Sequence, residues 1–245
     1  MLDKIANACN YLLHNYPDAQ ISKDYLDTRL SKESQEKWGF GYFPEIKNIN
    51  VLTDLVSEDD LLNEKLLYKN SKMYNYFENH PLLMQQKDAY GNIIAFIGRT
   101  LLDEKTRKAK DIIKYKNTSF KKGCHLFGLY ENKSNILEKD CVYIVEGQFD
   151  VIKATEKGLN NIVATGNSSL TAYQFSLIMR YTNNIFLLLD NDEAGEKGRK
   201  LIIKNYGSLA NIRNFYVPMP YKDIDEYITK ENIENYSDMS FVVKD

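Results

Sequence analysis

Cysteine is scarce in this sequence: it occurs 3 times among 245 residues, at positions 9, 124 and 141. No two of these cysteines form a CxxC pair, and an odd number does not suit a disulfide framework. The sequence therefore excludes a zinc ribbon and a disulfide-stapled domain. It favours a protein of a reducing compartment, and we expect it in the cytoplasm.

Long apolar runs are missing as well. No stretch approaches the roughly 18 apolar residues that a membrane-spanning helix needs, and polar side chains interrupt the first 20 residues, unlike those of a signal peptide. We therefore expect no association with a membrane. With 43% hydrophobic and 27% charged residues, the composition is typical of a globular protein with one large or two modest domains, at roughly 100–200 residues each.

The second half contains a regular alternation of strand-like and helix-like segments. Short apolar runs predict strands at 141–147, 160–166, 183–190 and 211–219, and helical spacing predicts helices at 149–158, 170–181 and 193–207. This alternation indicates an α/β domain with a central, mostly parallel sheet flanked by helices. The part before it lacks the alternation and predicts a mixed α+β subdomain. We expect three regions, 1–135, 136–220 and a short acidic helical segment at 221–245.

Acidic side chains lie where three of these strands end. The residues concerned are Glu146, Asp150, Asp190, Asp192, Asp223 and Asp225. Ligands of parallel sheets gather beyond the carboxyl ends of the strands, so acids far apart in sequence can meet at one edge. Clustered carboxylates repel one another unless a hard cation balances them, and oxygen ligands suit Mg²⁺ or Mn²⁺. Any one of these acids alone is explained by a helix cap or a surface charge, but the three stretches together predict a metal site.

Basic residues are concentrated between Lys105 and Lys122, where eight lysines and arginines stand against one acid. Such a run is either a solvated face or a track for phosphates, which bind through charge neutralisation and counterion release. Tyr115 and Phe120 lie among the basic residues, and this interleaving favours a surface for single-stranded nucleic acid. The basic run by itself leaves both interpretations open.

The motifs "EGQFDV", "LDNDEAG" and "KDIDEY" resemble those of a Toprim domain, in which a glutamate follows a first strand and a DxD follows a later one. Toprim domains occur in topoisomerases, primases, small nucleases and recombination proteins, so these motifs alone do not choose a function. The segments "RLSKESQEKWGFGYFP", "YGNIIAFIGR", "IKYKNTSFKKGCHLFGLY" and "VATGNSSLT" resemble the catalytic core of bacterial-type primases of the DnaG family. The resemblance runs in consistent order over about residues 20 to 230.

This resemblance implies a nucleotidyltransferase that makes short RNA primers on a single-stranded DNA template from ribonucleoside triphosphates. It implies that Glu146, Asp190 and Asp192 are catalytic and hold Mg²⁺ or Mn²⁺, with the other three acids nearby. The positions that match the family's template- and nucleotide-facing segment are Arg99, Lys114, Tyr115, Asn117 and Lys122. Lys87 stands where the family commonly has an arginine, so a positive charge is kept while a planar fork is lost.

The sequence also departs from the usual layout of that family. It has no Cys/His set for an N-terminal zinc-binding domain, no GxxxxGK[ST] loop of a fused helicase, and too few residues after Pro218 for the usual C-terminal domains. We expect either an excised core or a reduced primase of a virus or mobile element. The latter would act in the host cytoplasm with a separate zinc-binding domain and a separate replicative helicase.

Two other classes of protein remain open. A Toprim nuclease would use the same acids to cleave DNA and would need no nucleotide site. A non-catalytic single-stranded DNA-binding module would keep the basic run but would not need six acids at strand ends. A topoisomerase is disfavoured, because nothing marks a nucleophile among the 18 tyrosines and the chain lacks domains for a strand gate.

Overall fold

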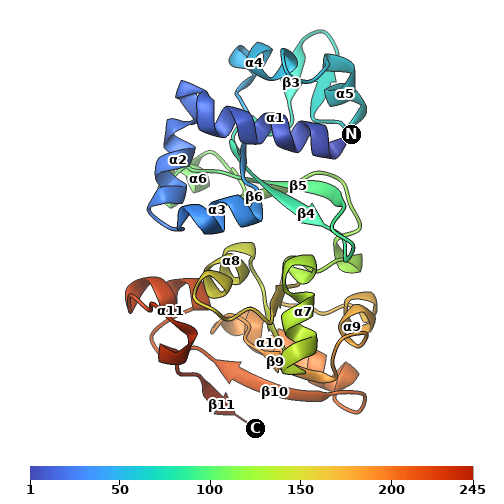
Figure 1. The fold of residues 1–245 in the computed structure, drawn as a ribbon, viewed down its shortest axis with the longest axis vertical. Helices are drawn as coiled ribbons and strands as arrows, with labels where there is room; N and C mark the ends of the chain where they lie inside the picture. Colours follow the sequence, from blue (N-terminus) through green and yellow to red (C-terminus); the bar gives the residue numbers. More distant parts are fainter. Residues whose placement is uncertain (245) are drawn as a thin grey trace. The chain divides into compact units, whose positions relative to one another are not determined.

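The computed structural model describes residues 1–244, which fall into two units (Figure 1). The N-terminal unit consists of residues 1–86 and 93–120. The C-terminal unit consists of residues 87–92 together with the chain from Lys121 onward. Each unit has its own sheet and its own buried apolar side chains, so each is described by itself.

The N-terminal unit is built on an antiparallel sheet and an amphipathic helix. The sheet has the order β1 (Gly41–Tyr42), β4 (Leu82–Lys87), β5 (Ile93–Arg99) and β6 (Tyr115–Asn117). Helix α1 (Leu2–Asn15) packs against β1 and β5 with one buried face that contains Ile5, Cys9 and Leu12. The remaining elements are η1 (Pro17–Ala19), α2 (Gln20–Asp27), α3 (Lys32–Trp38), η2 (Ile46–Asn48), α4 (Asn50–Thr53), α5 (Glu58–Asn63), β2 (Leu67–Lys69), β3 (Met73–Asn75) and α6 (Glu104–Ala109).

The mixed α+β character predicted for this part of the chain is confirmed. It contains an opening helix, two short helices before an aromatic turn, and a hairpin whose second strand ends at Arg99. The small hairpin of β2 and β3 and the short helix α6 in the basic run were not predicted. Neither segment has a strong apolar periodicity, because each has mostly exposed or half-buried side chains.

The C-terminal unit is organised around a five-stranded sheet. Its order is β11 (Val242–Lys244), β10 (Asn211–Tyr216), β9 (Asn184–Leu187), β7 (Val142–Val145) and β8 (Ile162–Ala164). All pairs are parallel except β10 with β11. Helices α8 (Gln148–Glu156), α9 (Ala172–Ile178) and α10 (Glu193–Tyr206) connect the parallel strands. The predicted α/β architecture with a mostly parallel sheet is therefore confirmed.

Side chains pack on both faces of this sheet. On one face, the core includes Val142, Ile144 and Ile185 from the strands, packed with helix residues such as Ile136 and Ile202. On the other face, aromatic rings pack edge to face or stack, with centroid distances of 4.7 to 6.2 Å. These rings belong to Tyr143, Phe186, Phe215 and Phe241.

The boundary predicted near residue 135 falls inside helix α7 (Leu129–Lys139) of the C-terminal unit. The polar stretch there is not a linker, because Asn132 is fully buried and its amide donates hydrogen bonds to Thr155 Oγ1 at 3.1 Å and to the Ile162 carbonyl at 2.9 Å. The predicted regions 1–135 and 136–220 therefore differ from the observed units.

The last stretch of the chain also differs from the helical segment predicted for 221–245. It contains α11 (Ile224–Lys230), η4 (Tyr236–Asp238) and strand β11, which pairs with β10. The exposed side chains of β11 made this strand hard to recognise from sequence. The remaining short element of the unit is η3 (Lys122–Cys124). Residues 221–244 thus extend the sheet of the C-terminal unit.

Candidate active site

Two acids meet at the carboxyl edge of the parallel sheet. Glu146 directly follows β7, and Asp190 follows β9, the neighbour of β7, after Leu188 and Leu189. The backbone N–H of Asp190 donates a hydrogen bond to Glu146 Oε1 at 3.3 Å. The parallel topology therefore joins two carboxylates that are 44 residues apart in sequence.

The Glu146 carboxyl is in an environment that opposes its ionisation. Burial raises its pKa to about 7, and the neighbouring charges of Asp190 and Asp192 add to the increase. The Asp190 N–H and Lys222 oppose the increase without cancelling it. The edge thus has more negative charge than the protein groups around it balance, which is the electrostatic condition under which a cation binds.

Asp192 has two tasks at the start of α10. Its Oδ1 accepts a hydrogen bond from the Gly195 N–H at 3.0 Å, and this bond is the main reason that the pKa of Asp192 lies below its usual value. Gly195 is required here because a Cβ at this position would lie 2.1 Å from the carbonyl oxygen of Asp190. The other oxygen of Asp192, Oδ2, takes no part in this cap and faces the ammonium of Lys222.

The other three predicted acids lie in the same unit and serve partly as helix caps. Asp150 is 8% exposed and accepts hydrogen bonds from the N–H groups of Gly147 at 3.0 Å and Asp225 at 3.3 Å. Asp223 caps α11 by accepting from the Glu226 N–H at 2.7 Å. Burial is the main cause that raises the pKa of both Asp150 and Asp223. The hydrogen bond between Asp150 and the Asp225 N–H joins α8 to the beginning of α11, and the charge of Asp190 adds to the increase in the pKa of both Asp150 and Asp223.

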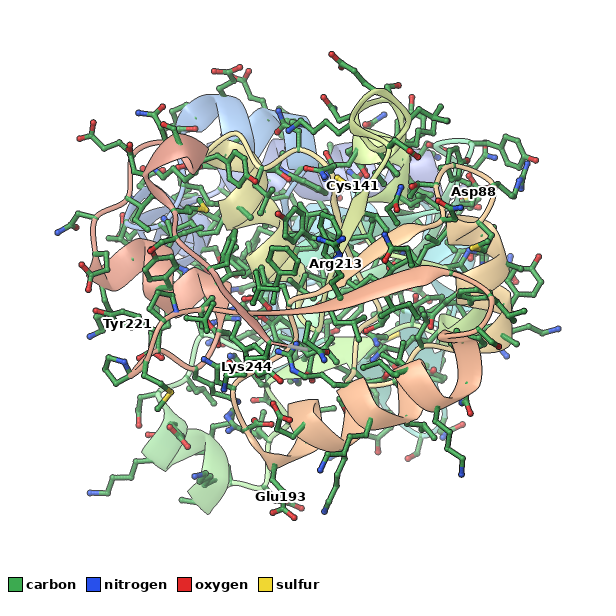
Figure 2. All side chains as sticks on the ribbon, turned by 90° about the horizontal axis from the view of Figure 1, so that it is seen from below. Asp88, Cys141, Glu193, Arg213, Tyr221 and Lys244 are labelled. Carbon is green, nitrogen blue, oxygen red and sulfur yellow. The ribbon has the colours of Figure 1, made fainter. Side chains whose placement is uncertain are left out.

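Lys222 is the cation that faces the paired aspartates. Its ammonium nitrogen lies 3.1 Å from Asp190 Oδ2 and 3.2 Å from Asp192 Oδ2. The loop that carries it, with Tyr221 just before it, and the beginning of α10 at Glu193 are visible in Figure 2. No role was predicted for this lysine, although its position in "YKDIDEYI" beside two acids was a signal.

The carboxylate oxygens at this edge suit a divalent cation in their chemistry, but they do not converge on one point. Among residues 1–244, no three His, Cys, Asp or Glu side chains converge as a ready-made ligand group. Carboxylate oxygens are the ligands that Mg²⁺ and Mn²⁺ prefer. In this structure the ammonium of Lys222, with a single positive charge, lies between Asp190 and Asp192. Glu146, Asp190 and Asp192 are thus suitable ligands that must draw together to hold an ion.

Arg199, a buried residue of α10, supports this edge of the sheet, and no signal in the sequence indicated this role. It is 1% exposed, and its guanidinium donates hydrogen bonds to the carbonyls of Leu187 at 2.6 Å, Leu189 at 2.5 Å and Phe215 at 3.0 Å. The guanidinium carbon also lies 4.0 Å from the centre of the Tyr216 ring. Leu187 and Leu189 belong to the segment that leads to Asp190, so Arg199 holds the end of β9 in place.

The predicted nucleic-acid residues of the N-terminal unit cluster on β5 and β6. Arg99 is paired with Tyr115 across the two strands and donates to the hydroxyl of Tyr115. The guanidinium carbon of Arg99 lies 4.9 Å from the ring centre of Tyr25 and 5.0 Å from that of Tyr115. Lys114 is exposed, and its ammonium lies 5.6 Å from the Tyr115 ring. Arginine beside aromatic rings is an arrangement that binds bases and phosphates.

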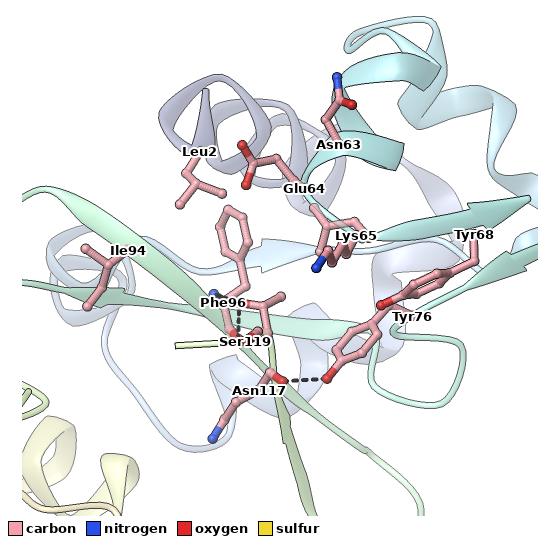
Figure 3. A pocket seen from close by; sticks show the side chains of 12 residues that line it. Leu2, Asn63, Glu64, Lys65, Tyr68, Tyr76, Ile94, Phe96, Asn117 and Ser119 are labelled. Atoms are coloured by element: carbon pink, nitrogen blue, oxygen red, sulfur yellow. Dashed lines mark hydrogen bonds between the residues drawn. The ribbon is translucent and has the colours of Figure 1, made fainter. Parts of the chain in front are cut away.

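Other members of the basic run have structural partners. Lys116 donates to the Tyr76 carbonyl at 2.8 Å and lies 4.1 Å from the Tyr76 ring centre. The hydroxyl of Tyr76 donates to the main-chain carbonyl of Asn117 beside a cavity of about 480 Å³, and Figure 3 shows the amide of Asn117 directed away from this cavity. The run is therefore partly structural and partly exposed.

The predicted basic residues Lys87 and Lys122 belong to the C-terminal unit. Lys87 forms an ion pair with Glu131 at 3.1 Å. Lys122 donates to the carbonyl of Gly166 at 2.6 Å, and burial lowers its pKa. Gly166 has a left-handed φ of +82° and lies in the predicted "VATGNSSLT" segment. The structure thus places Lys122 against that segment.

The raised pKa of Glu146 predicts a pH-dependent stability in metal-free buffer. The pKa of Glu146 in the folded protein is about 7, above its ordinary value of 4.5. The stability that the protonated carboxyl contributes is complete below pH 4.5 and is lost as the pH rises through 7. We expect Glu146→Gln in EDTA to raise the melting temperature by about 2–4 °C at pH 8 and by much less at pH 5. Scanning calorimetry of both proteins at the two pH values measures this. The same shift at both values would contradict the assignment.

No helix among residues 1–244 has the length and apolar character needed to cross a membrane.

Two protein families match this chain. The DNA primase catalytic core, N-terminal domain, matches residues 10–133. The Toprim-like family matches residues 143–228, which contain the acids of the sheet edge. The two matches follow one another in the same order as in the resemblance seen in the sequence.

Individual relatives agree with these matches. The DNA primase of Aquifex aeolicus (strain VF5) is 30% identical over 234 residues, which are 93% of this chain and 45% of that protein. The crystal structure of an Aquifex aeolicus primase with its zinc-binding and RNA polymerase domains has a TM-score of 0.76 at 28% identity, over 98% of this chain and 60% of that one. A DnaG primase catalytic domain bound to ssDNA has a TM-score of 0.77 at 27% identity, over 94% and 76% of the two chains. This chain spans less than half the length of the Aquifex protein.

Proposed function

Because the chain belongs to the DnaG family of DNA primases and contains a Toprim domain, we propose that it synthesises short RNA primers on a single-stranded DNA template. The observation that carries this proposal is the carboxylate edge formed by Glu146, Asp190 and Asp192. The family match of residues 10–133 favours nucleotide joining over cleavage by a Toprim nuclease.

The carboxylate edge suits metal-dependent transfer of a nucleotidyl group. Glu146, Asp190 and Asp192 would hold Mg²⁺ or Mn²⁺, which lowers the pKa of an attacking 3′-hydroxyl and balances the charge of a triphosphate. The protein contributes orientation: the Gly195 N–H directs Asp192, the Asp190 N–H holds Glu146, and Arg199 braces the strand that leads to Asp190. Asp150, Asp223 and Asp225 keep the loop before α11 beside this edge.

The basic and aromatic residues suit the binding of template and nucleotide. Arg99 presents a planar fork beside Tyr115, which can grip a phosphate while the ring stacks on a base. Lys114, Lys122 and Lys87 add positive charge, and Asn117 adds an amide at the end of β6. The substrates we propose are ribonucleoside triphosphates and single-stranded DNA.

Other proteins complete this activity in our proposal. One solved relative includes a zinc-binding domain, and we propose that such a domain acts here on a separate protein or chain segment. A replicative helicase is the second proposed partner, because primers are made where duplex DNA is opened. We expect the protein to act in the cytoplasm, where such replication takes place.

The lysines provide a prediction about salt dependence. Each phosphate contact contributes about 0.7 to the slope of log K against log salt for a single strand. We expect Lys114→Ala and Lys122→Ala each to weaken binding of a single-stranded oligonucleotide and to lower this slope by about 0.7. Fluorescence anisotropy titrations at several salt concentrations measure both quantities.

The matched control for these lysines is Lys204→Ala, an exposed lysine on α10, which should leave the slope unchanged. Slopes that stay equal to that of the parent for Lys114→Ala and Lys122→Ala would favour the alternative interpretation of this run as a solvated face.

The direct test of the proposed function distinguishes joining from cutting. The parent chain is incubated with single-stranded DNA, ribonucleotides and Mg²⁺ or Mn²⁺, with and without a zinc-domain protein and a helicase. New short RNA is the expected product. Shortened DNA without incorporated ribonucleotides would instead establish a nuclease, and neither product under any of these conditions would leave a binding module.

A further inference from the structure

We propose that Lys222 is a built-in counter-cation of the metal site, which holds Asp190 and Asp192 in the metal-free protein, yields its place to a divalent ion, and then binds a phosphate of the incoming nucleotide. This inference rests on the proposed function, because it concerns the same carboxylate edge. It adds a residue that joins metal entry to nucleotide binding.

The ammonium nitrogen of Lys222 lies 3.1 and 3.2 Å from one oxygen each of Asp190 and Asp192. A Mg²⁺ ion requires oxygen distances of about 2.1 Å. The ammonium therefore directs the two carboxylates toward a common point, but their oxygens lie farther from that point than they would from a metal ion. This explains why the acids are gathered at one edge without forming a closed ligand group.

The backbone of Lys222 is anchored by Asn191, the residue between the two aspartates. The Asn191 N–H donates to the Lys222 carbonyl at 2.7 Å. The Asn191 side-chain amide donates to the carbonyls of Val217 at 3.0 Å and Tyr221 at 2.8 Å. On the other side, the Lys222 N–H donates to Glu226 Oε2 at 2.9 Å. The ammonium can thus leave the aspartates while its main chain stays beside them.

The Lys222 side chain is 54% exposed, and ion pairs with this degree of exposure stabilise a protein weakly. One ammonium supplies a single positive charge against the carboxylates of Glu146, Asp190 and Asp192, whereas a divalent ion supplies two. Exchange is therefore favourable, and the lysine lowers the apparent metal affinity only by a small factor.

The released ammonium has an obvious anionic partner. Divalent ions at such edges also bind the phosphates of a nucleotide. A lysine binds phosphate as a mobile point charge on a flexible stem, without the fixed geometry of arginine. Because the main chain of Lys222 stays next to Asp190 and Asp192, its ammonium remains within a side-chain length of any phosphate bound there.

The proposal predicts effects of opposite sign on two ligands. We expect Lys222→Met to bind Mn²⁺ about three- to tenfold more tightly than the parent, because the competing cation is gone. We expect the same variant, in saturating Mn²⁺, to bind ATP about three- to tenfold more weakly, because a phosphate contact is lost. A lysine with a merely structural role would weaken both or change neither. Isothermal titration calorimetry measures both affinities without requiring catalysis.

Two further variants make the result interpretable. Lys222→Arg keeps the positive charge and should bind Mn²⁺ within about twofold of the parent, in contrast to Lys222→Met. Lys230→Met removes an exposed lysine from the last turn of α11 and should leave both affinities unchanged. Mn²⁺ binding by Lys222→Met that equals or falls below that of the parent would overturn the proposal, as would unchanged ATP binding.

The experiment also separates this inference from the proposed function. Asp190→Asn combined with Asp192→Asn should abolish the Mn²⁺ binding of the parent if the metal site is correct. If this double variant binds Mn²⁺ as the parent does, the metal site of the proposed function fails and Lys222 has no ion to exchange with. If the double variant loses Mn²⁺ but Lys222→Met behaves as the parent, only the present inference fails.

Discussion

Primer synthesis by a Glu146→Gln variant is expected to be at least about 10³-fold slower than by the parent. Glutamine keeps the size of the side chain and an acceptor for the Asp190 N–H, so the local fold is preserved. It removes the charge that would hold a metal ion, and a metal ion contributes several kcal/mol to this kind of transition state. Gel analysis of labelled ribonucleotide incorporation measures the loss.

Binding of single-stranded DNA by Glu146→Gln in EDTA should remain within about twofold of the parent or become tighter, because a negative charge near phosphates is removed. Arg99→Ala should behave differently and weaken binding and synthesis together, since we propose that Arg99, which donates to the Tyr115 hydroxyl, places the substrate. Glu138→Gln, an exposed acid on α7, makes the same change of charge and should have no effect on either. Full synthesis by Glu146→Gln would remove Glu146 from the catalytic set.

The second large effect is on stability. Arg199→Leu is expected to lower the free energy of unfolding by about 3 kcal/mol, because three buried carbonyls lose a charged hydrogen-bond donor. Leucine fills part of the volume and avoids the cost of burying a charge, which keeps the loss below that of an unpaired buried ion. Urea unfolding followed by far-UV circular dichroism measures the change.

Hydrogen exchange should place this effect at the sheet edge. In Arg199→Leu, amides of β9 and β10 should exchange faster than in the parent, and Mn²⁺ binding should weaken because the segment that leads to Asp190 loosens. Lys200→Met, at the exposed neighbour of Arg199 on α10, should leave stability and exchange unchanged. A stability equal to that of the parent for Arg199→Leu would show that the three carbonyls find other donors.

A large part of the C-terminal unit was predictable because its signals are local. Apolar runs of four or more residues mark β7 and β9, and each run stops where a carboxylate follows, at Glu146 and Asp190. The parallel topology follows from the alternation of strands and helices, and it places these two ends at one edge. The helix that contains Asn132 was missed because its buried polar side chain looks the same in sequence as a solvated one.

The sequence by itself determined the family and the parallel α/β architecture, and it supplied the acids and bases that we propose for the active site. Only the tertiary structure decided which charges meet: Lys222 lies between Asp190 and Asp192, and Arg199 lies beneath the strand that leads to them. The physical reason is that strand and helix signals depend on neighbouring residues in the chain. Ion pairs and buried hydrogen bonds depend instead on distances between segments, which exist only once the sheet has formed.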